Sequence, residues 1–207
     1  QTGLLVPQDA QLRQVMDVWV HKTSLLGDDP IDSPEATAGN AVPGLTVPIF
    51  AAMLVSIPTA KIVEGLLFHR IKKRALLFLL MKRRGLQKTL TLKPVAGVLN
   101  RSAKAMTAHL HELELQLESS GGPWICGDQF TLADVGMMVI FDRLREGDWL
   151  HLLVHHRPAL DAYWTALQQR PSYQAGCADF VHPAVAEATV ELAALKQADH
   201  WPPGIPR

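Results

Sequence analysis

The six residues from Phe130 to Val135 carry the signals of a helix start, and they constrain the fold more tightly than any other stretch. Thr131 has the side chain of an N-cap residue, and Asp134 can accept a hydrogen bond from the backbone N–H of Thr131. Phe130 and Val135 stand at the two positions of a hydrophobic staple, which fixes the direction in which the chain enters a helix. The helix dipole also favours a carboxylate in the first turn. We therefore predict that a helix begins here, and that these four residues are structural and not catalytic.

Apolar side chains recur at helical spacing through most of the chain, and no stretch shows the alternation typical of a β-strand. Helix boundaries are marked as well, since Asp9 can cap the first helix, Gly85 can end a later one, and Pro94 suits a first helical turn. These patterns predict an all-α bundle. The predicted helices cover residues 9–26, 61–84, 94–118, 134–144, 159–169 and 185–197.

The ends of the chain differ in composition from its middle. We expect residues 1–7 to be a linker that follows an N-terminal domain not contained in these 207 residues. Residues 8–197 are the predicted helical domain. Residues 198–207 should form an irregular tail, because the last seven residues hold three prolines and a glycine.

Residues 27–60 are expected to be an insertion in the helical domain. Its first part, residues 27–44, is rich in Asp, Pro, Ser and Gly and predicts a long loop. Its second part, residues 45–57, is strongly apolar but contains Pro48. Because a membrane-spanning helix needs roughly 20 apolar residues, we interpret this part as a buried or interfacial segment.

The overall composition excludes several classes of protein. The apolar fraction is 48% and the charged fraction 19%, which suits a folded core and not a disordered chain. The formal net charge is zero, so nothing indicates a nucleic-acid partner. The two cysteines, Cys126 and Cys177, are too few for a disulfide framework and suit the cytoplasm or another reducing compartment.

Four pieces of the sequence resemble the C-terminal helical domain of the glutathione transferase superfamily. They occur in that family's order and together cover about residues 92–175, while residues 7–26 resemble the first helix of that domain. The pieces are the amphipathic segment 109–117, the segment 123–129, the cap 130–134, and the stretch that runs from Arg157-Pro158 through Trp164 to residues 170–173. The resemblance implies an all-α bundle of the glutathione transferase C-terminal type.

The resemblance also implies a function. In that family a thioredoxin-like first half binds glutathione and supplies the activating Tyr, Ser or Cys, and the helical half builds one wall of the hydrophobic substrate pocket and part of the dimer interface. We therefore expect glutathione as co-substrate, a homodimer, a thioredoxin-like partner domain, and no catalytic residue in this chain. The isolated 207 residues should not transfer glutathione. The alternative is a non-enzymatic module that assembles with protein partners or a membrane surface.

Few side chains outside the cap could carry chemistry. Cys126 lies near a helix N-terminus, which can lower the pKa of a thiol, but we expect an inert, partly buried group. His151 and His155 are spaced i, i+4, yet no further ligand completes a zinc site, so no metal is expected. His109 and His111 point to different faces of a helix.

Residues 61–93 form the one markedly basic stretch, with ten Lys or Arg residues against Glu64. A solvated helix face is the plain interpretation. An anionic partner, a membrane surface beside the apolar segment 45–57, or attraction of an anionic ligand such as glutathione are the alternatives. The candidate patch for an anionic partner is made of Lys72, Lys73, Arg74, Lys82, Arg83 and Arg84.

Overall fold

The computed structural model describes residues 5–68, 72–198, 201–202 and 204–205, with only the backbone described at residues 56, 66 and 72–75. In chain order its helices are α1 (Ala10–Thr23), α2 (Ala38–Leu45), α3 (Val47–Ser56), α4 (Thr59–Phe68), α5 (Lys72–Leu90), α6 (Lys93–Ser120), α7 (Leu132–Glu146), α8 (Leu150–Leu153), α9 (Pro158–Gln168), α10 (Pro171–Gly176) and α11 (Pro183–Gln197), with two 3₁₀ turns, η1 (Pro30–Asp32) and η2 (Ala178–Phe180). Pairing of the β type is limited, in this described part, to two isolated bridges within residues 124–129. The fold is all-α, as predicted.

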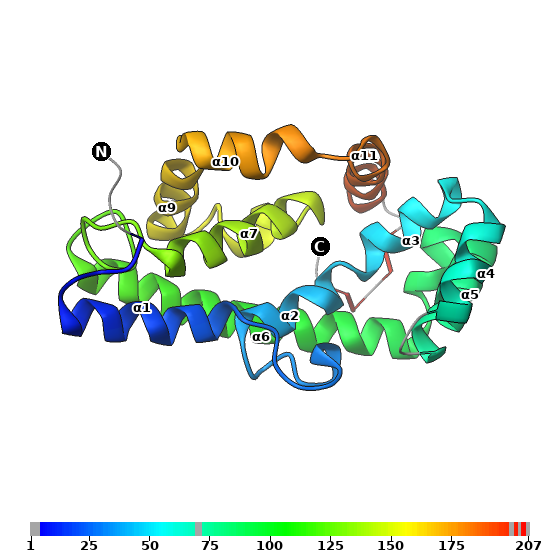
Figure 1. The fold of residues 1–207 in the computed structure, drawn as a ribbon. Helices are drawn as coiled ribbons and strands as arrows, with labels where there is room; N and C mark the ends of the chain where they lie inside the picture. Colours follow the sequence, from blue (N-terminus) through cyan, green and yellow to red (C-terminus); the bar gives the residue numbers. More distant parts are fainter. Residues whose placement is uncertain (1–4, 69–71, 199–200, 203, 206–207) are drawn as a thin grey trace.

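The long helix α6 forms the axis of the molecule (Figure 1). Figure 1 shows α1, α7 and α9 grouped around one half of α6, while α4 and α5 lie at the other end. The buried face of α6 carries residues at helical spacing, and Gly121, with φ of 73°, ends the helix in the left-handed conformation. The fully buried side chains of this face include Leu99, Met106, Leu110 and Leu113.

Helix α1 begins as the sequence predicts. The carboxylate of Asp9 accepts hydrogen bonds from the backbone N–H groups of Gln11 and Leu12, both at 2.9 Å. Helix α1 packs against α7, and this contact needs a residue without a side chain at Gly136, because an added Cβ there would lie 2.3 Å from the hydroxyl of Thr23. The helix ends at Thr23, three residues before the predicted end at Leu26.

The loop predicted for residues 27–44 is only half correct, because α2 begins at Ala38 and includes Pro43. The hydroxyl of Thr37 caps this helix by accepting a hydrogen bond from the backbone N–H of Asn40 at 3.0 Å. Helix α2 packs against α6 at a glycine: an added Cβ on Gly44 would lie 2.0 Å from Oγ of Ser102. Packing on α6 therefore stabilises a helix whose own sequence, rich in Gly and Pro, does not predict one.

The buried side chain of Asn40 fixes the remaining loop. Its Oδ1 accepts a hydrogen bond from the N–H of Leu26 at 2.8 Å, and its Nδ2 donates to the carbonyl oxygens of Leu26 and Ser33, both at 3.1 Å. These bonds satisfy the whole amide, which suits its complete burial. The segment between α1 and α2 is therefore held at both ends by one residue.

The apolar segment 45–57 is largely buried, as predicted. It forms α3, in which Ile49, Ala51 and Leu54 belong to the core. The stretch Ala38–Val55 has the length and composition of a membrane-crossing helix, yet 67% of it is buried inside the protein. Helix α3 packs against α5 and α11.

The single long helix predicted for residues 61–84 is wrong. The segment forms two helices, α4 and α5, which pack side by side. The apolar run of this segment does not reveal the break, because one long helix and two packed helices would both bury its apolar side chains. Gly85 lies outside helical geometry, with φ of 74°, and the chain resumes a helical course after it up to Leu90.

The described residues of the predicted tail, 198–207, are irregular but not loose. Trp201 is buried and contacts Trp149, with ring centroids 6.3 Å apart. Trp149 in turn donates a hydrogen bond from Nε1 to the carbonyl of Leu45 at 2.9 Å. Trp201 therefore belongs to the core beside α2.

Candidate functional site

The motif residues singled out in the sequence meet around the carboxylate of Asp134, which is completely buried. Its Oδ1 accepts hydrogen bonds from the backbone N–H of Ile125 at 3.0 Å and from the hydroxyl of Tyr163 at 2.9 Å. Its Oδ2 accepts from the backbone N–H of Thr131 at 2.8 Å. One carboxylate thus ties the 123–129 segment, the start of α7 and helix α9 together.

The cap at the start of α7 is a reciprocal capping box, in which Thr131 and Asp134 each bond the other's backbone. The hydroxyl of Thr131 also lies 3.2 Å from Oδ2 of Asp134. Burial raises the pKa of Asp134, and the four hydrogen bonds that it accepts act in the opposite direction. Phe130 and Val135 are both partly buried, but no contact between them is established, so the staple stays a prediction.

The other motif pieces close around this centre. Gln116 of α6 donates from Nε2 to the carbonyl of Ile125 at 3.0 Å. The guanidinium of Arg170 lies 3.5 Å from the ring centroid of Phe130 and 5.3 Å from that of Trp124. These charges and rings are engaged with one another, so the motif is a structural centre.

An ion pair joins the fourth motif piece, which begins at Arg157-Pro158, to α6. Arg157, directly before α9, donates from Nη2 and Nε to the carboxylate of Glu114 at 2.7 and 3.0 Å. Both side chains are largely buried, so solvent screens this two-donor contact less than an exposed pair. Helices α6 and α9 are therefore fixed relative to each other.

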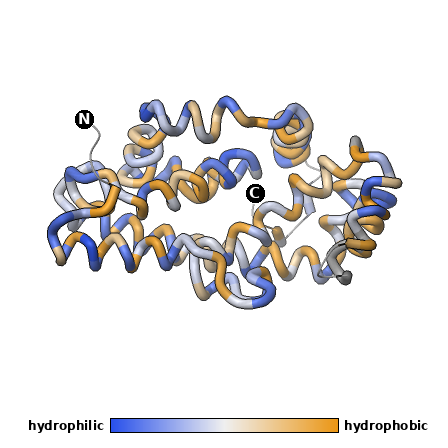
Figure 2. Tube along the Cα trace, in the orientation of Figure 1, coloured by the Kyte–Doolittle hydropathy of each residue, from blue (hydrophilic) through white to orange (hydrophobic). Residues whose placement is uncertain are grey.

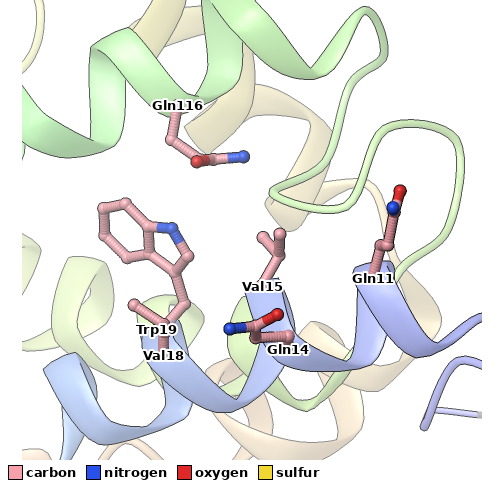
Figure 3. Close-up of a pocket in the computed structure, with 6 residues that line it drawn as sticks. All are labelled: Gln11, Gln14, Val15, Val18, Trp19 and Gln116. Atoms are coloured by element: carbon pink, nitrogen blue, oxygen red, sulfur yellow. The ribbon is translucent and has the colours of Figure 1, made fainter.

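A hollow of ≈ 430 Å³ lies beside this centre, between α1 and α6. Figure 3 shows Gln116 of α6 pointing across it toward α1, from which Val15 and Trp19 point back. Trp19 is buried, whereas Val18 is about half exposed. The residues that line the hollow are Gln11, Gln14, Val15, Val18, Trp19 and Gln116.

The lining of the α1–α6 hollow limits what it can do chemically. It offers three carboxamides and three apolar side chains, and none of these residues is an acid, a base or a thiol. Such a surface can bind and orient an apolar group beside hydrogen-bonding amides, but it cannot supply a nucleophile or a general base. Chemistry at this place would require groups from elsewhere.

The two cysteines have the environment of inert thiols. Cys126 is buried, and its Sγ lies 3.6 Å from the carbonyl oxygen of Leu12. Burial raises the pKa of Cys126, and it does the same for Cys177. A raised pKa lowers the fraction of reactive thiolate at neutral pH.

Three of the histidines singled out in the sequence contact other groups, and no three potential metal ligands gather among the described residues. His155 Nδ1 lies 2.6 Å from the carboxylate of Asp161, and His151 Nδ1 lies 3.7 Å from that of Asp148. His109 Nε2 lies 3.2 Å from the carbonyl oxygen of Pro34.

A second hollow opens among α3, α4 and α5. It has a volume of ≈ 280 Å³, and Phe50 and Phe78 join it to a smaller one of ≈ 100 Å³. Their lining is apolar except for Lys61 at the larger hollow and Thr46 at the smaller one. Sequence reasoning did not predict this hollow, because it depends on how the two helices of residues 59–90 fold back on each other.

The candidate basic patch divides in two. The Nζ of Lys82 donates to the carbonyl oxygens of Leu54, Val55 and Ile57 at 3.0, 3.1 and 2.6 Å, and it thereby caps the end of α3. Arg83 and Arg84 are exposed. The side chains of residues 72–74 lie outside the described ones, and the anionic partner stays a prediction.

Lys196 is a buried cation that sequence reasoning missed. Its Nζ lies 3.8 Å from the ring centroid of Trp149 and 5.4 Å from that of Trp201. It donates to the carbonyl oxygens of Gly147 and Asp148. Burial lowers the pKa of Lys196 to about 8, against the opposing effect of Asp148.

Part of the chain is similar in sequence to known proteins. Residues 100–175 match the family model described as the C-terminal domain of glutathione S-transferase. The glutathione S-transferase TCHQD of Arabidopsis thaliana is 33% identical over 78 residues, which are 38% of this chain and 29% of that protein. The matched region therefore spans less than a third of the length of this relative. No solved structure matches the chain.

Proposed function

We propose that this chain is the helical half of a glutathione transferase-like enzyme, because residues 100–175 match the model of the glutathione S-transferase C-terminal domain. The matched residues comprise most of α6, the capped start of α7 and helix α9. Asp134 joins α7 to α9, and the ion pair of Glu114 with Arg157 joins α6 to α9. In this proposal the half builds one wall of the substrate pocket and part of a homodimer interface.

The observation that carries the proposal is the hollow between α1 and α6, which lies directly beside the matched motif. Gln116 belongs to both, because it bonds Ile125 and lines the hollow. Val15, Val18 and Trp19 give an apolar surface suited to the carbon skeleton of an electrophile. The rigid centre beside them would hold this wall in place.

The reaction in this proposal is attack of the glutathione thiolate on an electrophilic small molecule. A new S–C bond forms, and the leaving group departs or a proton is taken up, according to the electrophile. A thioredoxin-like domain would bind glutathione and stabilise its thiolate, since the α1–α6 hollow has no titratable side chain of its own. The chain then supplies binding and orientation in the cytoplasm or another reducing compartment.

The test is an assay of glutathione conjugation with a panel of electrophiles, on the 207-residue chain and on the longer protein that joins it to a thioredoxin-like domain. We expect turnover from the longer protein and none from the chain alone. Val18→Asp in the longer protein should raise KM for an apolar electrophile and leave KM for glutathione unchanged. Val190→Asp, at an exposed position of α11, is the matched control. A longer protein that neither binds glutathione nor conjugates any electrophile would refute the proposal.

A second candidate function is a non-enzymatic module that assembles with a protein or membrane partner. The observation that favours it is the set of exposed apolar side chains on α3, α4 and α5, far from the matched motif. The test replaces these apolar side chains by Ser. If the substituted chain still binds its partner as the wild type does, this candidate function is wrong.

A further inference from the structure

Helices α4 and α5 expose large apolar side chains at one end of the molecule. On α4 these are Val63, Leu67 and Phe68, and on α5 they are Leu76 and Leu80. Phe68, at the end of α4, is 83% exposed, the largest exposed fraction among the large apolar side chains of the described residues. Exposure of such an apolar cluster to water is unfavourable, and clusters of this kind typically mark a surface that binds a protein or a membrane.

Each of these helices is apolar on two faces. Ile62 of α4 and Met81 of α5 are buried and face α3 and the second hollow. Val63 and Leu67, and likewise Leu76 and Leu80, are spaced i, i+4, so each pair forms an outward stripe on its helix. Folding of this chain buries the first face and leaves the side chains of the second exposed.

The segment that contains these two helices carries half of the chain's Lys and Arg residues. Ten of the 20 Lys and Arg residues lie in residues 61–93, with only one of the 20 acidic residues. The rest of the chain is left with ten basic residues and nineteen acidic ones. The net charge of zero therefore hides a strong separation of charge along the molecule. Figure 2 shows hydrophobic and hydrophilic residues side by side in α4 and α5.

We propose that the lobe formed by α3, α4 and α5 docks on the surface of an anionic lipid bilayer. Leu67 and Phe68 enter the boundary between headgroups and acyl chains, and the exposed Arg83 and Arg84 contact the anionic headgroups. The lobe lies on the bilayer and does not cross it, because α4 has 10 residues and a crossing needs roughly 20.

Charge and position favour a bilayer over other occupants. A second copy of the chain, placed face to face on this lobe, would bring two strongly basic surfaces together. Residues 5–9, which lead into α1, lie at the opposite end of the molecule (Figure 1), so a domain joined there would not cover the lobe directly. The inference concerns this lobe alone and holds whether or not the proposed catalysis is correct.

Flotation of the 207-residue chain with vesicles tests the inference. Vesicles of phosphatidylcholine with about 30% phosphatidylserine should carry the chain, and vesicles of phosphatidylcholine alone should carry much less. Raising the salt from ~0.1 M to ~1 M shortens the screening length from about 10 Å to about 3 Å and should weaken binding. Equal binding to neutral vesicles, or no binding to either kind, overturns the proposal.

Substitution of Leu67 and Phe68, the apolar tip of α4, tests whether side chains insert into the bilayer or whether charge attraction alone binds the chain. The variant Leu67→Ser/Phe68→Ser should bind anionic vesicles about tenfold less tightly or worse. Phe180→Ser removes an equally exposed apolar side chain from η2 and should bind like the wild type. An equal loss in both variants, or a tip variant that binds normally, overturns the proposal.

A charge variant tests the proposal independently, in case substitution of Leu67 and Phe68 disturbs the folding of the lobe. Arg83→Glu/Arg84→Glu should abolish binding to anionic vesicles, and the control Arg101→Glu/Lys104→Glu, on exposed positions of α6, should retain it. Circular dichroism must show native helix content in each variant that is scored. If the lobe instead forms a dimer, light scattering would show a dimer that Leu67→Ser/Phe68→Ser dissociates without lipid, which also overturns the proposal.

Discussion

Replacement of Asp134 by Ala should destabilise the fold far more than the loss of an ordinary helix cap. The side chain is completely buried and accepts hydrogen bonds from Ile125, Thr131 and Tyr163. Asp134→Ala would leave the N–H groups of Ile125 and Thr131 and the hydroxyl of Tyr163 buried without an acceptor. Each orphaned donor costs about 1–3 kcal/mol, and relief of the buried carboxylate returns part of this.

We therefore expect Asp134→Ala to lower the free energy of unfolding by about 3–5 kcal/mol, whereas an N-cap alone is worth about 1 kcal/mol. Tyr163→Phe removes one donor and leaves the others paired, so it should cost about 1–2 kcal/mol. The two effects should not add in the double variant, because both substitutions remove the same hydrogen bond.

Urea unfolding followed by tryptophan fluorescence and circular dichroism measures these free energies. Asp161→Ala is the matched control, since Asp161 also lies in the first turn of a helix, but its carboxylate is partly exposed and pairs with the exposed His155. It should cost under about 1 kcal/mol. If Asp134→Ala costs no more than Asp161→Ala, the reasoning that makes Asp134 the structural centre is refuted.

Three further predictions concern other contacts. Gly44→Ala should destabilise by about 1–3 kcal/mol because its Cβ would lie 2.0 Å from Oγ of Ser102, and thermal unfolding should show Ser102→Gly restoring part of the loss. Burial lowers the pKa of Lys196 to about 8, so between pH 8 and the unfolded value of 10.5 the unfolded chain binds the extra proton. Wild type should then gain on the order of 2–3 kcal/mol relative to Lys196→Met as pH rises from 7.5 to 10, and a constant difference in urea unfolding would contradict this. Cys126, buried and with a raised pKa, should react with a thiol reagent much more slowly in the folded chain than in urea, and equal rates would show an open thiol.

The parts of the fold that follow local rules could be predicted from the sequence. The starts of α1 and α7 depend on Asp9 and Thr131, whose caps act over three residues, and the end of α6 depends on Gly121. The four motif pieces could also be identified in the sequence. What it could not show is that Asp134 binds three of them through one carboxylate, because Tyr163 lies 29 residues away in the chain.

The parts that depend on distant contacts were missed. Pro43 and Gly44 favour a loop locally, and only the close approach to Ser102 of α6 makes a helix there favourable. The apolar residues of α4 and α5 fit one long helix as well as two packed ones, so the periodicity cannot place the break. The second hollow and the partners of Lys82 follow from that break, and no local signal announces them.

The single carboxylate that joins Ile125, Thr131 and Tyr163 also bears on the order in which the chain folds. These partners lie within 29 residues of Asp134, so they meet by closing short loops. By contrast, Cys126 meets Leu12 across 114 residues, and Trp149 meets Leu45 across 104. Low sequence separation favours early assembly, so the middle of the chain should form the nucleus. Helix α1 leaves the ribosome before α7, so its packing against α7 has to wait until α7 has been made.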